Sequence, residues 1–289
     1  MKLLVTGDFH ITEKNYKDIL VIFPQILNIA KRADAICLLG DIFDNEIPTP
    51  SDIDLFVNFL VEIRKLNKKI FMISGNHNNK NGIYADQWID KILDITYHPT
   101  ILRLRVDNKN ILMAHIALKE SKTYSNIVVS NISADTFKED IVLLGHIHKP
   151  QIIKEKPLIL HPGSPYYVRF DEIQDTKGVY IIDTSDLSYQ FVKLNPIEAI
   201  ELTDKDFLKA EDLTGKKIKV IITDLNLLKD VSAKADKFNL KIKLKYTRQN
   251  FTISQQSKLS TKSIKDLFIQ FCSQNNIPDD IKREILNQL

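Results

Sequence analysis

Residue types that bind metal ions recur at five places in this chain, each time just after a short apolar run. The runs are residues 2–6, 35–39, 70–74, 111–114 and 141–144. The polar residues that follow them are Asp8 and His10, Asp41 and Asp44, Asn76, His77 and Asn78, His115, and His146 and His148. Carboxylate, amide and imidazole donors without cysteine suit Mn²⁺, Fe or Zn²⁺ better than Cu(I) or an iron–sulfur cluster.

The number of donors exceeds what one metal ion needs. Two metal ions about 4 Å apart can clamp an in-line displacement at phosphorus and generate a nucleophile near neutral pH. A bridging carboxylate would hold such a pair together, and Asp41 is the natural candidate. The donor set therefore predicts metal-assisted hydrolysis of a phosphate ester.

Buried strands must deliver these side chains to one place. Short apolar runs bounded by glycine are typical of buried strands, and ligands in α/β folds bind just beyond the carboxyl ends of such strands. Four glycines stand one residue before a candidate ligand, at Gly7, Gly40, Gly75 and Gly145. We expect these glycines to supply the unusual backbone angles of a tight strand-to-loop turn.

Each motif on its own has an ordinary structural explanation. Asp8 alone is more typical of a turn or a helix N-cap, and a lone His115 after an apolar run is more typical of a buried, hydrogen-bonded histidine. The His146-x-His148 pair is a stronger signal, because alternate residues of a strand share a face. Five such motifs in one chain are hard to explain as unrelated turns.

The rest of the chain shows strands and helices around these motifs. Helical patterns span residues 16–31, 51–66 and 83–93, and apolar strands are expected at 178–183 and 189–194. Residues 217–246 predict a β-α-β unit. A polar linker is expected at 249–261, followed by two amphipathic helices in 262–289. The apolar stripe of the 51–66 helix, which includes Phe56, Leu60 and Ile63, indicates core packing or a contact between two subunits.

Composition narrows the class of protein. The 289 residues suffice for a large core and a smaller second domain, and no stretch approaches the roughly 18–20 apolar residues of a membrane span. Cys37 and Cys272 read as unpaired residues of a reducing compartment, so we expect a cytoplasmic protein without a membrane. Residues 205–248 carry twelve Lys and Arg against six Asp and Glu. That basic segment indicates either binding to a phosphate backbone or a merely solvated face.

These motifs resemble the calcineurin-like metallophosphoesterases. The resemblance rests on the strings around Asp8, Asp41, Asn76, His115 and His146. The GDIFD string at 40–44, and the PGS and RFDE strings at 162–164 and 169–172, are similar to the SbcD-type nucleases, the nuclease subunit of the SbcCD double-strand-break repair complex. The resemblance covers residues 1 to about 200 well and the remainder only in layout.

The resemblance implies a role for each motif residue. It assigns one metal ion to Asp8, His10, Asp41 and His148, and the other to Asp41, Asn76, His115 and His146. It places His77 over the scissile phosphate, where this residue stabilises the transition state and helps to protonate the leaving 3′ oxygen. The cofactors implied are two Mn²⁺ ions, with Mg²⁺, Fe or Zn²⁺ as alternatives. Asp41 and His77 are thus the expected catalytic residues.

Two positions depart from the family pattern. The family usually has Asp after Gly-Asn-His, but this chain has Asn78. That position is normally a supporting one, so the substitution affects a contact behind the metal ligands rather than a ligand. Some relatives carry His where this chain has Asp44, the other supporting position, and the balance between exonuclease and endonuclease action is expected to depend on it.

The expectation is therefore an α/β protein: a two-sheet metallophosphoesterase sandwich flanked by helices, with a small β-α-β cap and a C-terminal helical pair. We expect a nuclease domain at residues 1–200, a DNA-binding cap domain at 201–248, and a linker with C-terminal helices at 249–289 that bind an SbcC-like SMC-type ATPase. The expected activity is manganese-dependent hydrolysis of DNA phosphodiesters by a homodimer in repair or recombination. The alternatives are a calcineurin-like phosphatase or phosphodiesterase acting on other substrates, and an inactive scaffold.

Overall fold

All five apolar runs form strands, and those of the five that are sheet neighbours of one another pair in parallel. The structure is a computed structural model that describes residues 1–80, 83–84, 86, 95–124, 130–238, 240 and 242–246. The runs correspond to β1 (Lys2–Thr6), β2 (Ala35–Leu39), β3 (Lys69–Ile73), β8 (Lys109–Ala114) and β9 (Ile141–Leu144). The pairs β1–β2, β2–β3 and β8–β9 are each parallel, so the carboxyl ends of the paired strands meet at a common edge.

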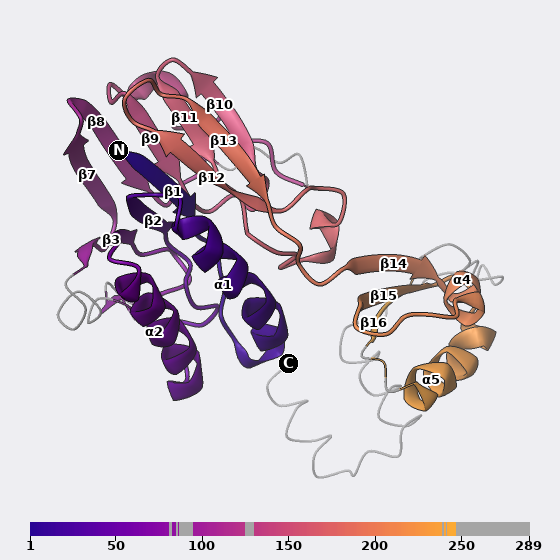
Figure 1. The fold of residues 1–289 in the computed structure, drawn as a ribbon. Helices are drawn as coiled ribbons and strands as arrows, with labels where there is room; N and C mark the ends of the chain where they lie inside the picture. The colour runs from indigo at the N-terminus through magenta and orange to yellow at the C-terminus, as the bar shows by residue number, and fades with distance from the viewer. Residues whose placement is uncertain are drawn as a thin grey trace, which may run out of the picture. The chain divides into compact units, whose positions relative to one another are not determined.

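These strands belong to two sheets (Figure 1). The six-stranded sheet has the order β13-β12-β1-β2-β3-β6 and the five-stranded sheet the order β10-β11-β9-β8-β7. Their further strands are β6 (Thr96–His98), β7 (Ile101–Val106), β10 (Gln151–Glu155), β11 (Leu158–His161), β12 (Gly178–Asp183) and β13 (Tyr189–Lys193). The expected strands at 178–183 and 189–194 are thus present as β12 and β13.

The alternation of side chains along β1 separates two cores. Leu3 and Val5 pack in a cluster with residues of both sheets, including Ile111 and Leu143. Leu4 points to the opposite face and joins the cluster that contains the two long helices. Because successive strand residues face opposite sides, a fully apolar strand of this kind must be covered on both faces. The sequence of β1 therefore specifies a central layer.

Two helices cover the outer face of the six-stranded sheet. The helices α1 (Tyr16–Ala30) and α2 (Pro50–Lys65) lie beside each other (Figure 1). The start of α2 is set by a capping box between Thr49 and Asp52. Its stripe of Phe56, Leu60 and Ile63 is buried in the helix–sheet core, which confirms core packing for these residues.

The prediction of a helix at 83–93 is wrong for its first two residues. Ile83–Tyr84 forms the short strand β5, which pairs with β4 (Asn79–Lys80). The remainder of that predicted helix lies outside the described residues. The pattern was ambiguous because a short run of apolar residues can satisfy either a strand or a helix period.

A third sheet with its own core follows the sandwich. It contains β14 (Ala199–Thr203), β15 (Lys217–Ile222) and β16 (Ile242–Tyr246), with α4 (Asp204–Lys209) and α5 (Leu228–Lys237) between them (Figure 1). The predicted β-α-β unit is present as β15, α5 and β16, whereas β14 and α4 were not anticipated. The core of this unit includes Phe207, Ile218, Val220 and Val231.

The expected linker and C-terminal helical pair, residues 249–289, lie outside the described residues. Within the part of the chain that the structure describes, no helix combines the length and the apolar character that crossing a bilayer requires.

Candidate metal centre

The carboxyl ends of the strands bring the expected ligands together. Donor atoms of Asp8, His10 and His148 lie within 4.8 Å of one another, and we name this set the first donor cluster. The two Nε2 atoms of His10 and His148 face each other at 3.0 Å. Asp8 is fully buried, and its Oδ1 accepts a hydrogen bond of 3.0 Å from the backbone N–H of His146.

A second donor cluster, Asp41, His115 and His146, lies next to the first. The Nε2 atom of His115 is 3.1 Å from Asp41 Oδ2 and 4.0 Å from Asp8 Oδ1, so it stands between the two carboxylates. Asp41 also lies 3.7 Å from His10 Nε2, a nitrogen of the first cluster. Its carboxylate therefore touches both clusters, as a bridging ligand must.

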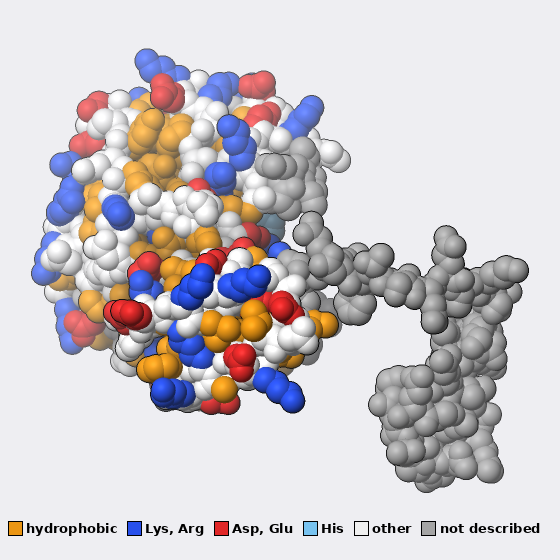
Figure 2. Space-filling model, turned by 90° about the vertical axis from the view of Figure 1, so that its right-hand side faces the viewer, with side chains coloured by type: hydrophobic (Ala, Val, Ile, Leu, Met, Phe, Trp, Pro, Cys, Tyr) orange, Lys and Arg blue, Asp and Glu red, His pale blue; other side chains and the backbone are white. Residues whose placement is uncertain are grey.

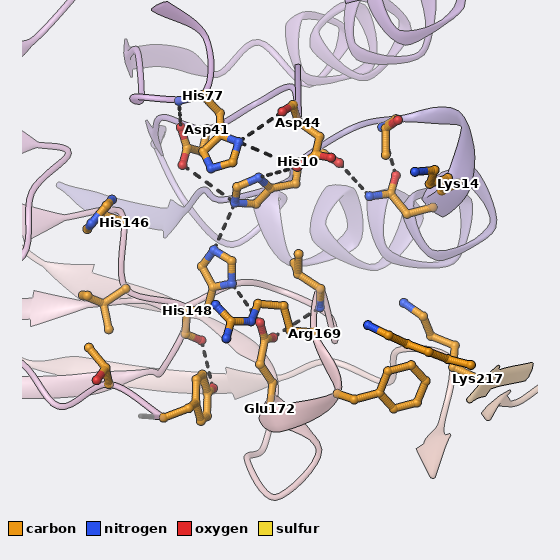
Figure 3. Close-up of a pocket in the computed structure, with 18 residues that line it drawn as sticks. His10, Lys14, Asp41, Asp44, His77, His146, His148, Arg169, Glu172 and Lys217 are labelled. Carbon is orange, nitrogen blue, oxygen red and sulfur yellow. Dashed lines mark hydrogen bonds and ion pairs between the residues drawn. The ribbon is translucent and has the colours of Figure 1, made fainter. Parts of the chain in front are cut away.

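Asn76 and His77 lie on the loop after β3. The Oδ1 atom of Asn76 is 2.8 Å from His146 Nδ1, which places it at the second donor cluster. The backbone N–H of His77 donates to Asp41 Oδ1 at 2.9 Å, while the His77 ring is 42% exposed and points into the pocket (Figure 3). A nitrogen of that ring also lies within 4.8 Å of donor atoms of His10 and Asp41.

Four candidate ligands have a backbone conformation that is rare for residues other than glycine. The φ angles are 51° at Asp8, 46° at His10, 45° at Asp41 and 84° at His146. Such left-handed conformations cost free energy and persist where the surrounding structure enforces them, commonly at functional sites. The backbone strain lies on the donor residues themselves.

The glycines that precede the candidate ligands do not all supply turn angles, which corrects the expectation from the sequence. Of Gly7, Gly40, Gly75 and Gly145, only Gly40 has a positive φ, of 88°. A Cβ atom at Gly75 would lie 2.0 Å from Asp41 Oδ1, and one at Gly145 would lie 2.1 Å from the Leu39 carbonyl oxygen. Gly75 and Gly145 are therefore required for close approach of neighbouring segments, not for turn angles.

The donors fit a bound cation. Asp8 Oδ2 is buried and has no hydrogen-bond partner among the described residues, and the buried His115 Nε2 faces the carboxylates of Asp41 and Asp8. Burial alone raises the pKa of Asp41, but the imidazoles of His115 and His10 lower it below its usual range. Burial lowers the pKa of His115, yet the contact with Asp41 and the charge of Asp8 raise it to about 9. A divalent cation would satisfy both the unpaired Asp8 oxygen and the buried carboxylates and imidazoles gathered around it.

The ring orientations are set by groups outside the five ligand motifs. His115 Nδ1 lies 2.7 Å from the carbonyl oxygen of Leu39, which turns Nε2 towards Asp41. His148 Nδ1 lies 2.8 Å from Glu172 Oε1, in the string already noted at 169–172. Lys177 forms a fully buried ion pair of 2.6 Å with Glu172, and no spacing rule in the sequence signalled it.

Asn78 supports the loop that carries Asp41. Its side chain is buried, accepts a hydrogen bond of 3.0 Å from the Ile42 N–H, and donates one of 2.9 Å to the Phe43 carbonyl. An amide can both accept and donate, whereas an ionised carboxylate can only accept. The departure from the family pattern therefore adds a donor to this loop.

Asp44 lies at the pocket side of the same loop. Its Oδ1 is 3.3 Å from His10 Nδ1 and 3.8 Å from His77 Nδ1, and its backbone carbonyl is 3.1 Å from His77 Nδ1. The contact with His10 lowers the pKa of the Asp44 carboxyl. Asp44 thus contacts a residue of the first donor cluster and the ring that faces the pocket.

The donor clusters open into a cavity of about 770 Å³. Its wall combines His77, His146 and His148 with the basic side chains of Lys14, Arg169, Lys217 and Lys243 (Figure 3). Lys217 and Lys243 come from β15 and β16. A cavity of this volume with cationic walls beside clustered metal donors suits a phosphate ester.

The fold and the donor clusters agree with the sequence comparisons. The calcineurin-like phosphoesterase superfamily domain matches residues 1–186, and the chain belongs to that superfamily of hydrolases. The resemblance stated from the motifs is thereby confirmed.

Particular relatives point to one branch of the superfamily. The chain is similar to the DNA double-strand break repair protein Mre11 of Saccharolobus solfataricus, with 24% identity over 259 residues that cover 72% of this chain and 68% of the relative. It is also similar to the SbcD subunit of the nuclease SbcCD from Bacillus subtilis, with 23% identity over 258 residues that cover 63% of this chain and 66% of that protein. A third relative, Mre11 of Methanosarcina mazei, is 30% identical over 98 residues, which are 31% of this chain and 15% of that protein.

Proposed function

We propose that this protein is a manganese-dependent DNA nuclease that hydrolyses phosphodiester bonds, as an exonuclease, an endonuclease or both, in repair or recombination. The observation that carries the proposal is the position of Asp41, whose carboxylate contacts nitrogens of both donor clusters. The names of the relatives, a nuclease subunit and two double-strand-break repair proteins, support DNA as the substrate.

The two donor clusters would hold two metal ions. One ion would be held by Asp8, His10 and His148. The other would be held by Asn76, His115 and His146, and Asp41 would bridge the two ions. When bound, such ions lower the pKa of water and neutralise charge on phosphoryl oxygens. Mn²⁺ is the metal that we propose, because oxygen and imidazole donors suit it, although Mg²⁺, Fe and Zn²⁺ accept the same donors.

His77 is the proposed general acid. Its ring reaches into the cavity, and its Nδ1 lies 3.1 Å from the carbonyl oxygen of Asp44, to which it donates. When the ring is an imidazolium, the opposite nitrogen, Nε2, also carries a proton and can give it to the leaving 3′ oxygen, while the ring charge stabilises the transition state. Histidine suits this role because an imidazole ordinarily exchanges its proton near neutral pH.

The basic wall of the cavity would contact the DNA backbone. Lys14, Arg169 and Lys243 line it, and phosphate contacts of this kind supply most of the affinity of non-specific DNA binding. Figure 2 shows Lys and Arg interspersed with Asp and Glu over the face that it draws. We therefore place DNA contacts at the cavity lysines and not on the whole surface of the third sheet.

A substrate comparison tests the proposed activity. Purified full-length protein, stripped of metal and reloaded with Mn²⁺, is assayed on linear duplex DNA, circular single-stranded DNA and a chromogenic phosphomonoester. We expect Mn²⁺-dependent DNA cleavage that EDTA abolishes, with the phosphomonoester hydrolysed at least about 10²-fold more slowly. Preferred hydrolysis of the monoester would instead support a phosphatase, and the absence of all hydrolysis would support the scaffold.

The same proposal includes two partners. We propose that the protein forms a homodimer. We also propose that an SbcC-like SMC-type ATPase binds residues 262–289, because the SbcCD name of the Bacillus subtilis relative denotes a subunit of a complex. Removal of 262–289 should abolish co-purification with the ATPase and leave Mn²⁺-dependent cleavage by the isolated protein intact. Co-purification at the affinity of the full-length chain would contradict the assignment.

A further inference from the structure

A buried ion pair stands directly behind one imidazole of the metal centre. Glu172 and Lys177 are both buried, and the Glu172 carboxylate is 2.8 Å from His148 Nδ1 through Oε1 and 2.6 Å from Lys177 Nζ through Oε2. Figure 3 shows Glu172 on the side of the His148 ring opposite His10. Removing two charges from water is costly, so a pair at this position calls for a reason other than stability.

The hydrogen bonds around Glu172 fix the direction of each proton. An ionised carboxylate can only accept, so Nδ1 of His148 must carry a hydrogen. In the neutral ring the other nitrogen, Nε2, then presents its lone pair to the first donor cluster, where it lies 3.0 Å from His10 Nε2. A nitrogen must have a free lone pair to bind a metal ion.

Lys177 holds the same histidine at its backbone. Its Nζ donates to the His148 carbonyl oxygen at 3.3 Å as well as to Glu172 Oε2 and to Ser164 Oγ. The Glu172 Oε2 atom also accepts from the Val168 backbone N–H at 3.2 Å. One ion pair therefore fixes both the ring and the backbone of His148.

We propose that Glu172 is a positioning residue that holds His148 in the tautomer with Nδ1 protonated, and that Lys177 fixes the direction in which Glu172 accepts. The proposal rests on the proposed function for the identity of the metal ion, but the tautomer itself is a property of the metal-free protein. Carboxylates behind metal-binding histidines commonly change metal affinity by about 10–100-fold.

Replacement of Glu172 by glutamine makes this proposal specific. Lys177 Nζ and Val168 N–H can only donate, so they would hold the amide oxygen of Gln at the place of Oε2. The amide NH₂ would then face His148 Nδ1 and force that nitrogen to accept. The proton would move to Nε2 and block the lone pair that faces the first donor cluster.

The experiment reads the tautomer directly. Full-length, metal-free protein with ¹⁵N-labelled histidine rings is examined by long-range ¹H–¹⁵N correlation, with the His148 signals assigned by comparison with His148→Gln. We expect an Nδ1–H tautomer in the wild type and an Nε2–H tautomer in Glu172→Gln. The control is Asp171→Asn, which removes a carboxylate one residue away that is exposed and pairs with Arg169; it should keep the wild-type tautomer.

Titration with Mn²⁺ gives the second readout. One of the two binding steps should weaken about 10–100-fold in Glu172→Gln, and neither should change beyond about twofold in Asp171→Asn. If the wild type binds no Mn²⁺, the proposed function fails, while the tautomer still decides the role of Glu172.

A neutral double variant covers the case in which Glu172→Gln does not fold. Glu172→Met with Lys177→Met removes both buried charges together and leaves no unpaired ion. His148 Nδ1 then loses its acceptor, and the same Mn²⁺ step should weaken about 10-fold or more. A folded variant of either kind that keeps the Nδ1–H tautomer and the wild-type affinity would overturn the proposal.

Discussion

Two regions of the molecule are built from apolar strands but differ in their loops and polar residues. One is the edge of the sandwich where the metal donors lie, and the other is the third sheet, β14 to β16. In β15 alternate residues, such as Ile218 and Val220, are buried, and Lys217 and Lys219 on the other face are partly buried and form ion pairs. Among the described residues of the third sheet and its connections, the only one with a positive φ is a glycine, Gly215, in the loop before β15. At the donor clusters four residues other than glycine take that conformation, and polar side chains such as Asp8 are fully buried.

The comparison distinguishes residues that stabilise the fold from residues whose conformation or burial costs free energy. The third sheet follows local preferences in β15, α5 and β16, where the alternation of buried residues and the backbone angles agree. The donor clusters violate those preferences through strained backbone and through the buried Asp8 Oδ2 atom, which has no hydrogen-bond partner in the part of the chain that the structure describes. Violations of this kind are expected where a ligand binds, so we propose the donor edge, and not the third sheet, as the site of chemistry.

The same contrast explains what could be predicted from the sequence. The strands and their terminal donors were predictable because an apolar run followed by Asp or His is a local pattern. α4, Asp204–Lys209, was missed because it is too short to show a helical period. Lys177 was missed because its pairing with Glu172 depends on the fold of the loop before β12, which also brings Lys177 to Ser164 and to the His148 carbonyl oxygen. The left-handed φ angles are set by tertiary contacts and have no local signal.

The largest expected effect is that of replacing the bridging carboxylate. Asp41→Asn should abolish DNA cleavage and reduce the number of bound Mn²⁺ ions by one, since the amide gives up the charge that touches both clusters. Asp54→Asn, an exposed change on α2, is the matched control and should behave as the wild type. Full cleavage activity in Asp41→Asn would contradict the model in which Asp41 bridges two metal ions.

The next effect separates binding from chemistry at the same edge. His77→Ala should retain affinity for Mn²⁺ and DNA but slow cleavage by about 10²-fold or more, since only proton donation is lost. His98→Ala, at an exposed histidine at the end of β6, should leave the rate unchanged. Weakened Mn²⁺ binding in His77→Ala would show that His77 is a metal ligand instead.

The smallest effect tests the third sheet. Lys243→Ser removes an exposed lysine that lines the cavity, and it should lower DNA affinity a few-fold and reduce the slope of log K against log salt by about 1. Lys229→Ser removes the same charge from α5, away from the cavity lining. Equal losses in the two variants would mean that the net charge of this sheet, and not the cavity wall, attracts DNA.

The central claim is that Asp41 joins two metal ions, and a structure of the Mn²⁺-loaded protein tests it most directly. Anomalous scattering at the manganese edge should show two peaks about 4 Å apart, one beside Asp8, His10 and His148 and the other beside Asp41, His115 and His146. Asp41 should contact both peaks. A single peak at full occupancy in protein that cleaves DNA would contradict the account.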